Sequence, residues 1–89
     1  MKQEIRTMLI DDEPLARESL KIFLSAYEGF DIVSECSNGL QAIQAINREK
    51  PDLVFLDVQM PEVNGFEVLN EIEPDIQPVV IFATGYEKY

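Results

Sequence analysis

A short apolar run that ends on a carboxylate is the feature that most constrains the fold of this chain. Residues 53–57 read Leu-Val-Phe-Leu-Asp, with Pro51 before them and Pro61 after them. Four bulky apolar residues without polar alternation are typical of a strand buried on both faces, as in a parallel sheet covered by helices. Asp57 then stands at the carboxyl end of a strand, where open α/β sheets bind ligands. Burial alone gives no reason for an aspartate there, so Asp57 is the first candidate for chemistry.

Apolar runs and helical periodicity alternate along the chain. Strands are predicted over residues 5–10, 30–35, 53–57 and 79–83, the last of them buried and leading into Thr84-Gly85. Helices are predicted over about 14–27, from Asn38 to before Lys50, and from Asn64 to before Pro74. Their apolar stripes consist of Ala16, Leu20, Phe23, Leu24 and Tyr27, then Leu40, Ala42, Ile43, Ala45 and Ile46, then Val68, Leu69 and Ile72.

This alternation predicts an α/β fold with a doubly wound parallel sheet. Parallel strands joined by helices cross over right-handedly, so helices lie on both faces. In the flavodoxin-like order the first and third strands are neighbours, which gives the order 2-1-3-4 for four strands and three helices. Asp11 and Asp12 follow the first strand directly. The fold therefore brings them beside Asp57 as one acidic cluster.

Size and composition restrict the class of protein. A chain of 89 residues has room for one domain, and its formal charge of −10 argues against binding a phosphate backbone. This charge fits a cation or a basic partner surface, although most of the seventeen carboxylates are expected only to keep the protein soluble. The polar amino terminus is unlike a signal peptide, and no apolar stretch is long enough for a bilayer, so we expect no membrane contact and a cytoplasmic protein. Cys36, the single cysteine, is expected to be a small, half-buried side chain.

The acidic cluster has a chemistry of its own. Carboxylates about 4 Å apart repel one another by roughly 4 kcal/mol per pair at an effective dielectric constant near 20, and a divalent cation removes this repulsion. A small, partly hydrated oxygen site suits Mg²⁺ better than Ca²⁺. An ionised carboxylate can attack phosphorus without a base, which suits a chain without histidine. The product would be an aspartyl phosphate on Asp57, and the Thr84 hydroxyl can bond a phosphoryl oxygen.

Three motifs resemble the receiver domain of two-component response regulators. They are Leu9-Ile10-Asp11-Asp12-Glu13-Pro14, then Leu53 to Pro61 with Asn64-Gly65, and Phe82-Ala83-Thr84-Gly85. They occur in the family's order along the whole chain, and the combination is far more specific than an isolated Asp-Asp pair. The Asp-Asp-Glu-Pro-Leu-Ala start and Thr84-Gly85-Tyr86 are also similar to receivers joined to LytTR-type DNA-binding domains.

The resemblance implies a role for each matching residue. Asp57 would accept a phosphoryl group from a phosphohistidine of a sensor histidine kinase. Asp12 and Asp57 would bind Mg²⁺ directly, Asp11 through water, and Gln59 through its backbone carbonyl. Thr84 would close on the phosphoryl group. The Gln59 and Tyr86 side chains would tune the lifetime of the phosphorylated state.

The chain departs from the family pattern after Thr84. The family continues with a fourth helix, a fifth strand that carries a phosphate-binding lysine and a switch aromatic, and a fifth helix. Lys88 is no substitute for that lysine, because it lies only four residues past Thr84. We therefore expect residues 1–89 to be the amino-terminal portion of a receiver domain from a longer regulator with a transcriptional output. The fourth strand is expected to leave an apolar edge open to another chain.

Three functions remain open at this point. The first is a phosphoacceptor module that assists its own phosphorylation and is not an enzyme for a separate substrate. The second is a binding or oligomerisation module without phosphorylation, in which another chain completes the sheet at the fourth strand. The third is a phosphohydrolase with an aspartyl nucleophile, which ranks last because Gln59 stands where a second aspartate is needed. Asp57 alone would be an ordinary strand-end residue, and its neighbours favour the first.

Overall fold

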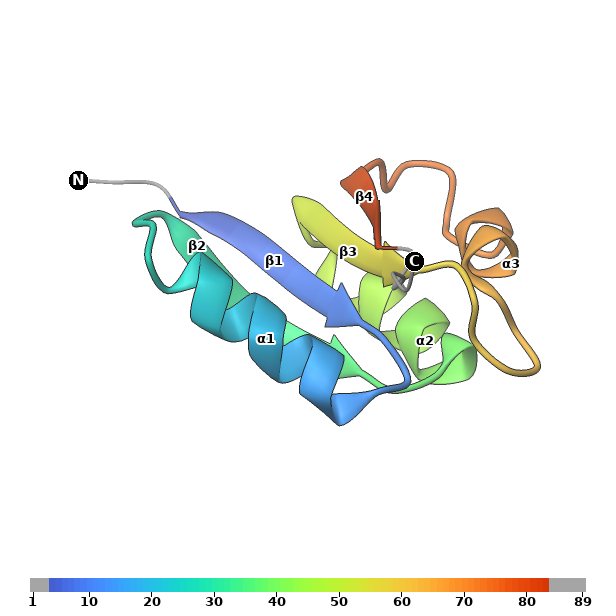
Figure 1. Ribbon diagram of the computed structural model, residues 1–89. Helices are drawn as coiled ribbons and strands as arrows, with labels where there is room; N and C mark the ends of the chain where they lie inside the picture. Colours follow the sequence, from blue (N-terminus) through green and yellow to red (C-terminus); the bar gives the residue numbers. More distant parts are fainter. Residues whose placement is uncertain (1–3, 84–89) are drawn as a thin grey trace.

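Four parallel strands and three helices form the part of the protein that the structure, a computed structural model, describes, residues 4–83. In chain order they are β1 (Ile5–Ile10), α1 (Pro14–Leu24), β2 (Phe30–Cys36), α2 (Gly39–Glu49), β3 (Leu53–Asp57), α3 (Gly65–Asn70) and β4 (Val79–Ala83). The strand order is β2-β1-β3-β4, with every neighbouring pair parallel. Helix α1 covers one face of the sheet, and α2 and α3 cover the other (Figure 1). The predicted flavodoxin-like fold is confirmed.

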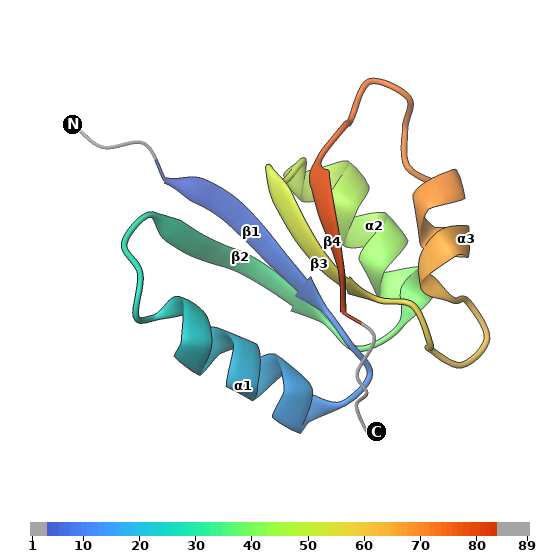
Figure 2. The same ribbon diagram turned by 45° about the horizontal axis from the view of Figure 1, so that its top comes forward.

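The main hydrophobic core lies between the sheet and the layer formed by α2 and α3. These two helices pack side by side across the sheet from α1 (Figure 2). Val54 and Leu56 of β3 and Ile46 of α2 are fully buried there. Met8, Ile10, Cys36, Ala42, Ala45, Met60, Val68 and Ile76 complete this core. The prediction of a buried central strand is confirmed, and its least buried member is Phe55.

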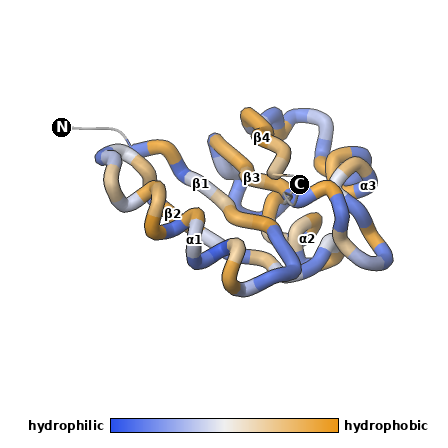
Figure 3. Tube along the Cα trace, viewed as in Figure 1, coloured by the Kyte–Doolittle hydropathy of each residue, from blue (hydrophilic) through white to orange (hydrophobic). Residues whose placement is uncertain are grey.

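Strand β4 is not the buried strand that its apolar sequence predicts. The side chains of Val79, Ile81 and Phe82 are 64%, 45% and 42% exposed. Figure 3 shows hydrophobic residues along this strand. Strand β4 stands last in the strand order. Helix α1, on the face of the sheet opposite α2 and α3, packs against β1 and β2. The apolar run therefore predicted the strand correctly but not its burial, whereas the predicted open apolar edge is confirmed within residues 4–83.

Helix α1 is shorter than the predicted helix over 14–27. It ends at Leu24, where the amides of Ala26 and Tyr27 bond to carbonyls only three residues earlier, at 3.2 and 3.0 Å. Such tight turns end an α-helical ladder. Phe23 and Tyr27 belong to the predicted buried stripe, but both are largely exposed, and their ring centroids lie 5.5 Å apart. The helix ends before its sheet-facing stripe reaches Tyr27.

Side-chain caps hold the starts of α2 and α3. Asn38 Oδ1 accepts a hydrogen bond from the Gln41 amide at 2.8 Å, and Asn64 Oδ1 accepts one from the Glu67 amide at 3.0 Å. Glu67 Oε1 in turn accepts from the Asn64 amide at 2.8 Å, which confirms the capping box at Asn64. At α2 the returning bond runs from the amide of Ser37 rather than that of Asn38 to Gln41 Oε1.

Three smaller differences separate prediction and structure. Strand β2 continues one residue further than predicted, to Cys36, which is buried rather than half-buried. Leu40 is largely exposed, because it borders the groove between α2 and α3 instead of facing the sheet. Ile72 lies beyond the short helix α3 but still packs against the core.

Within residues 4–83, no helix combines the length and hydropathy that a bilayer crossing requires.

Candidate functional site

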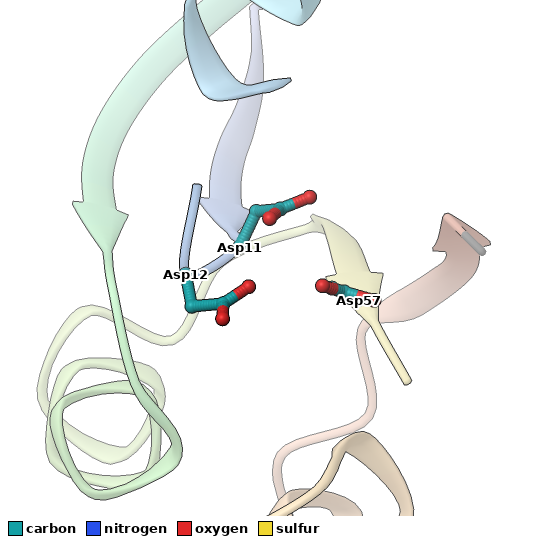
Figure 4. A group of neighbouring side chains, drawn as sticks. All are labelled: Asp11, Asp12 and Asp57. Carbon is teal, nitrogen blue, oxygen red and sulfur yellow. The ribbon is translucent and has the colours of Figure 1, made fainter. Parts of the chain in front are cut away.

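Three aspartates meet where β1 and β3 end. β1 ends at Ile10, so Asp11 and Asp12 follow it directly, and Asp57 is the last residue of β3. The two strands are neighbours, with Ile10 opposite Leu56, so their ends lie at the same edge of the sheet. One carboxylate oxygen from each aspartate lies within 4.8 Å of the other two (Figure 4). The predicted acidic cluster is therefore confirmed.

Backbone amides fix the two buried carboxylates of the cluster. The Glu13 amide donates to Asp11 Oδ1 at 2.9 Å, and the Gln59 amide donates to Asp57 Oδ1 at 3.0 Å. Each bond joins an aspartate to the second residue after it, as in an Asx turn. Each turn begins the loop that follows its strand. The hydrogen bond in the turn holds the carboxylate at the end of the sheet. Asp12 is more exposed than its two neighbours.

The crowded site holds protons more tightly than ordinary carboxylates do. Burial, together with the charges of Asp11 and Asp12, raises the pKa of Asp57 to about 6, against the opposing hydrogen bond from the Gln59 amide. Burial also raises the pKa of Asp11, with Asp12 adding to the effect. At neutral pH the carboxylates of the cluster therefore carry negative charge that the rest of the protein neutralises poorly. A bound cation would remove this cost.

The donors of the cluster fit a hard divalent cation. All three side chains offer carboxylate oxygen, the chain has no histidine, and Cys36 is buried in the core. Mg²⁺ takes oxygen ligands at about 2.1 Å, which places ligands on opposite sides of the ion about 4.2 Å apart. In this cluster one carboxylate oxygen from each aspartate lies within 4.8 Å of the other two, a separation close to that span. Asp11, Asp12 and Asp57 could hold Mg²⁺ in this way.

The loop after Asp57 is held tightly against the end of β3. The Gly65 amide donates to the Val58 carbonyl at 3.1 Å. A Cβ atom at Gly65 would lie 2.9 Å from the Asp57 carbonyl oxygen and 3.0 Å from Val58 Cα. These backbone atoms cannot move aside as a flexible side chain can, so the position requires glycine. Gly65 therefore shapes the loop after Asp57.

Several predicted site residues are not tested by the geometry. Thr84 and Tyr86 lie outside the described residues. Gln59 does contact Asp57, but through its amide, and its carbonyl as a metal ligand stays a prediction. The chemistry assigned to Thr84 likewise stays a prediction.

Sequence reasoning missed Arg17, which reaches the cluster from helix α1. Its Nη1 donates to the Asp11 carbonyl at 2.6 Å, and its Nε pairs with Glu35 Oε1 at 3.1 Å. Lys21 pairs with the same Glu35 at 2.8 Å. The available signal was the spacing of Arg17 and Lys21, which places two cations one helical turn apart on one face of the helix. Nothing in that spacing indicates which of them touches the β1 end.

Comparison with known proteins identifies the family. The response regulator receiver domain family matches residues 7–89. The chain is 42% identical over 85 residues to the transcriptional regulatory protein BtsR of Shigella flexneri. Its fold is similar to the receiver domain of a putative response regulator NarL from Mycobacterium tuberculosis, with a TM-score of 0.84 and 27% identity. It also resembles the response regulator domain of Thermotoga maritima CheB, with a TM-score of 0.80 and 31% identity. The chain belongs to the response regulator receiver domain family of two-component signalling.

The matches cover the chain more fully than they cover the relatives. The alignment with BtsR takes in 96% of this chain but 36% of BtsR, so the chain spans about a third of that regulator. The NarL receiver is matched over 98% of this chain and 71% of its own, and the CheB domain over 90% and 60%. The predicted receiver family is confirmed, and the LytTR-type subfamily stays a prediction.

Proposed function

We propose that this protein is a phosphoacceptor that takes a phosphoryl group onto Asp57. The observation that carries the proposal is the acidic cluster, in which Asp57 ends the central strand β3 beside Asp11 and Asp12. Membership of the receiver family supports the same role. The module acts as the receiving partner of a signalling pair rather than as an enzyme for a separate substrate.

The proposed transfer follows from the residues of the cluster. An ionised oxygen of Asp57 forms a bond to phosphorus as the P–N bond of a phosphohistidine breaks, and the electron pair of that bond stays on the imidazole nitrogen. The Gln59 amide, bonded to Asp57 Oδ1, leaves the second carboxylate oxygen as the nucleophile. Mg²⁺ bound by Asp11, Asp12, Asp57 and the Gln59 carbonyl would neutralise charge on the phosphoryl group. The Thr84 hydroxyl would bond one phosphoryl oxygen.

The partners follow from the family and from the relatives. We propose a sensor histidine kinase as the phosphoryl donor and the cytoplasm as the place of transfer. BtsR is a transcriptional regulatory protein, which supports a transcriptional output for the whole regulator.

Phosphorylation of the purified protein tests the proposal. Incubation with acetyl phosphate and Mg²⁺ should add one phosphoryl group to the intact mass, and Asp57→Asn should abolish the gain. Asp31→Asn is the matched control, because Asp31 is an exposed aspartate near the start of β2, away from the cluster. It should be phosphorylated like the wild type. No mass gain at any Mg²⁺ concentration in a folded sample, or a gain that survives in Asp57→Asn, would contradict the proposal.

The exposed strand β4 favours a second candidate function, self-association. Val79, Ile81 and Phe82 present apolar side chains on a strand whose outer edge has no partner strand within residues 4–83. Such an edge pairs readily with another chain. We expect light scattering to show dimers as the protein concentration rises, and Ile81→Lys to shift the protein towards monomer. A wild-type monomer at high concentration would argue against this function.

A further inference from the structure

Arg17 joins three elements beneath the acidic cluster. It belongs to α1, its Nη1 donates to the Asp11 carbonyl at the end of β1, and its Nε pairs with Glu35 of β2. The side chain is only 17% exposed. Lys21, on the next turn of α1, also pairs with Glu35 but is more exposed. Arg17 is therefore the residue of this pair with a bond to the β1 end.

The carbonyl that Arg17 binds belongs to the peptide unit between Asp11 and Asp12. Because that unit is planar, fixing its oxygen limits the rotation that aims both side chains. The preceding unit is held separately, since the Asp11 amide donates to the Cys36 carbonyl at 3.1 Å. The Glu13 amide then fixes Asp11 Oδ1. Arg17 thus provides the bond that orients the step from Asp11 to Asp12.

We propose that Arg17 is a positioning residue for the cation site, a role that rests on the function proposed above. Glu35 holds the guanidinium in place from β2, and the guanidinium holds the Asp11–Asp12 peptide so that both carboxylates face Asp57. The planar, forked guanidinium can bond both groups at once, which a lysine ammonium does less well. Arg17 acts through the backbone and does not itself touch the cation.

Charge and positioning predict opposite signs for the loss of Arg17. A positive charge near a cation site opposes cation binding, so removing charge alone should tighten Mg²⁺ binding. Losing a group that orients metal ligands typically weakens metal binding about 10- to 100-fold. The sign of the change in affinity therefore separates the two roles.

The test is Mg²⁺ affinity, measured by titration calorimetry at neutral pH on samples shown to be folded by circular dichroism. We expect Arg17→Ala to bind Mg²⁺ about tenfold more weakly than the wild type. Lys21→Ala is the matched control, since it removes a positive charge and a Glu35 ion pair but no bond to Asp11. It should bind as tightly as the wild type or slightly more tightly. Arg17→Lys, which keeps the charge, should lie between the wild type and Arg17→Ala, and it carries the test if Arg17→Ala does not fold.

Each result has a distinct meaning. Equal or tighter binding by the folded Arg17 variant, beside normal binding by the wild type, overturns the positioning role and leaves the proposed function intact. Equal losses in Arg17→Ala and Lys21→Ala also overturn it, because they would assign the effect to Glu35 alone. Absence of Mg²⁺ binding by the wild type overturns the cation site and the positioning role together.

Discussion

Asp57→Asn is expected to stabilise the metal-free protein by up to about 3 kcal/mol at pH 7.5. The folded protein raises the pKa of Asp57 from an ordinary 3.8 to about 6, chiefly by burial and also by the charges of Asp11 and Asp12. About two pKa units correspond to about 3 kcal/mol, because each unit is worth about 1.4 kcal/mol. Asparagine has nearly the same shape without the charge. It can still accept the bond from the Gln59 amide.

The pKa of Asp57 is raised in the folded protein, whereas folding more commonly lowers the pKa of a carboxylate. A raised pKa means that the folded protein binds the proton more tightly than the unfolded chain does. The stabilisation by protonated Asp57 is fully present below about pH 4 and is lost as the pH rises through about 6. The advantage of Asp57→Asn should therefore be largest at pH 7.5 and vanish near pH 4.

Urea unfolding in the presence of a chelator measures this difference at the two pH values. Asp31→Asn serves as the control, because it removes an exposed aspartate and should change the free energy of unfolding little at either pH. An advantage of Asp57→Asn that is equal at both pH values would show that charge is not its cause. No advantage at pH 7.5 would show that Asp57 is ordinarily solvated.

Mg²⁺ is expected to stabilise the wild-type protein at pH 7.5 by about 2.7 kcal/mol when present at 100 times its dissociation constant. A cation bound by the folded cluster would relieve the repulsion among Asp11, Asp12 and Asp57. The gain should fall steeply below pH 6, because protons compete for Asp57, whose pKa is about 6, and for Asp11, whose pKa is also raised. Thermal unfolding with Mg²⁺ and with a chelator measures the gain.

Asp12→Asn separates specific binding from general screening of this acidic chain. The formal charge of −10 means that any salt relieves some repulsion, so sodium chloride at equal ionic strength provides the baseline. Asp12 is the most exposed member of the cluster, so its substitution should disturb the metal-free fold least. The variant should lose most of the gain above that baseline. An undiminished gain in Asp12→Asn would place the cation elsewhere.

The sequence predicted the strands and the acidic cluster because both depend on simple rules. The apolar run ending in Asp57 indicates a central strand, and the topology of parallel sheets places Asp11 and Asp12 beside it. Neither inference requires knowledge of side-chain packing. The order of strands and the residues at their ends were sufficient.

Burial and support of the site were harder to predict, because they depend on which element faces which. Phe23 and Tyr27 have helical spacing, but α1 ends at Leu24, before Tyr27, and both side chains remain exposed. Strand β4 has the composition of a buried strand, yet its place in the order leaves it uncovered. The bond from Arg17 to the Asp11 carbonyl depends on the path of a loop, which periodicity does not determine.

The contact between Gly65 and the Asp57 carbonyl has a mechanical consequence. With no side chain between the two backbones, the start of α3 and the end of β3 have no compressible layer separating them. The Gly65 amide also bonds the Val58 carbonyl, so the two segments resist separation as well as compression. The end of β3 and the start of α3 are therefore expected to move together.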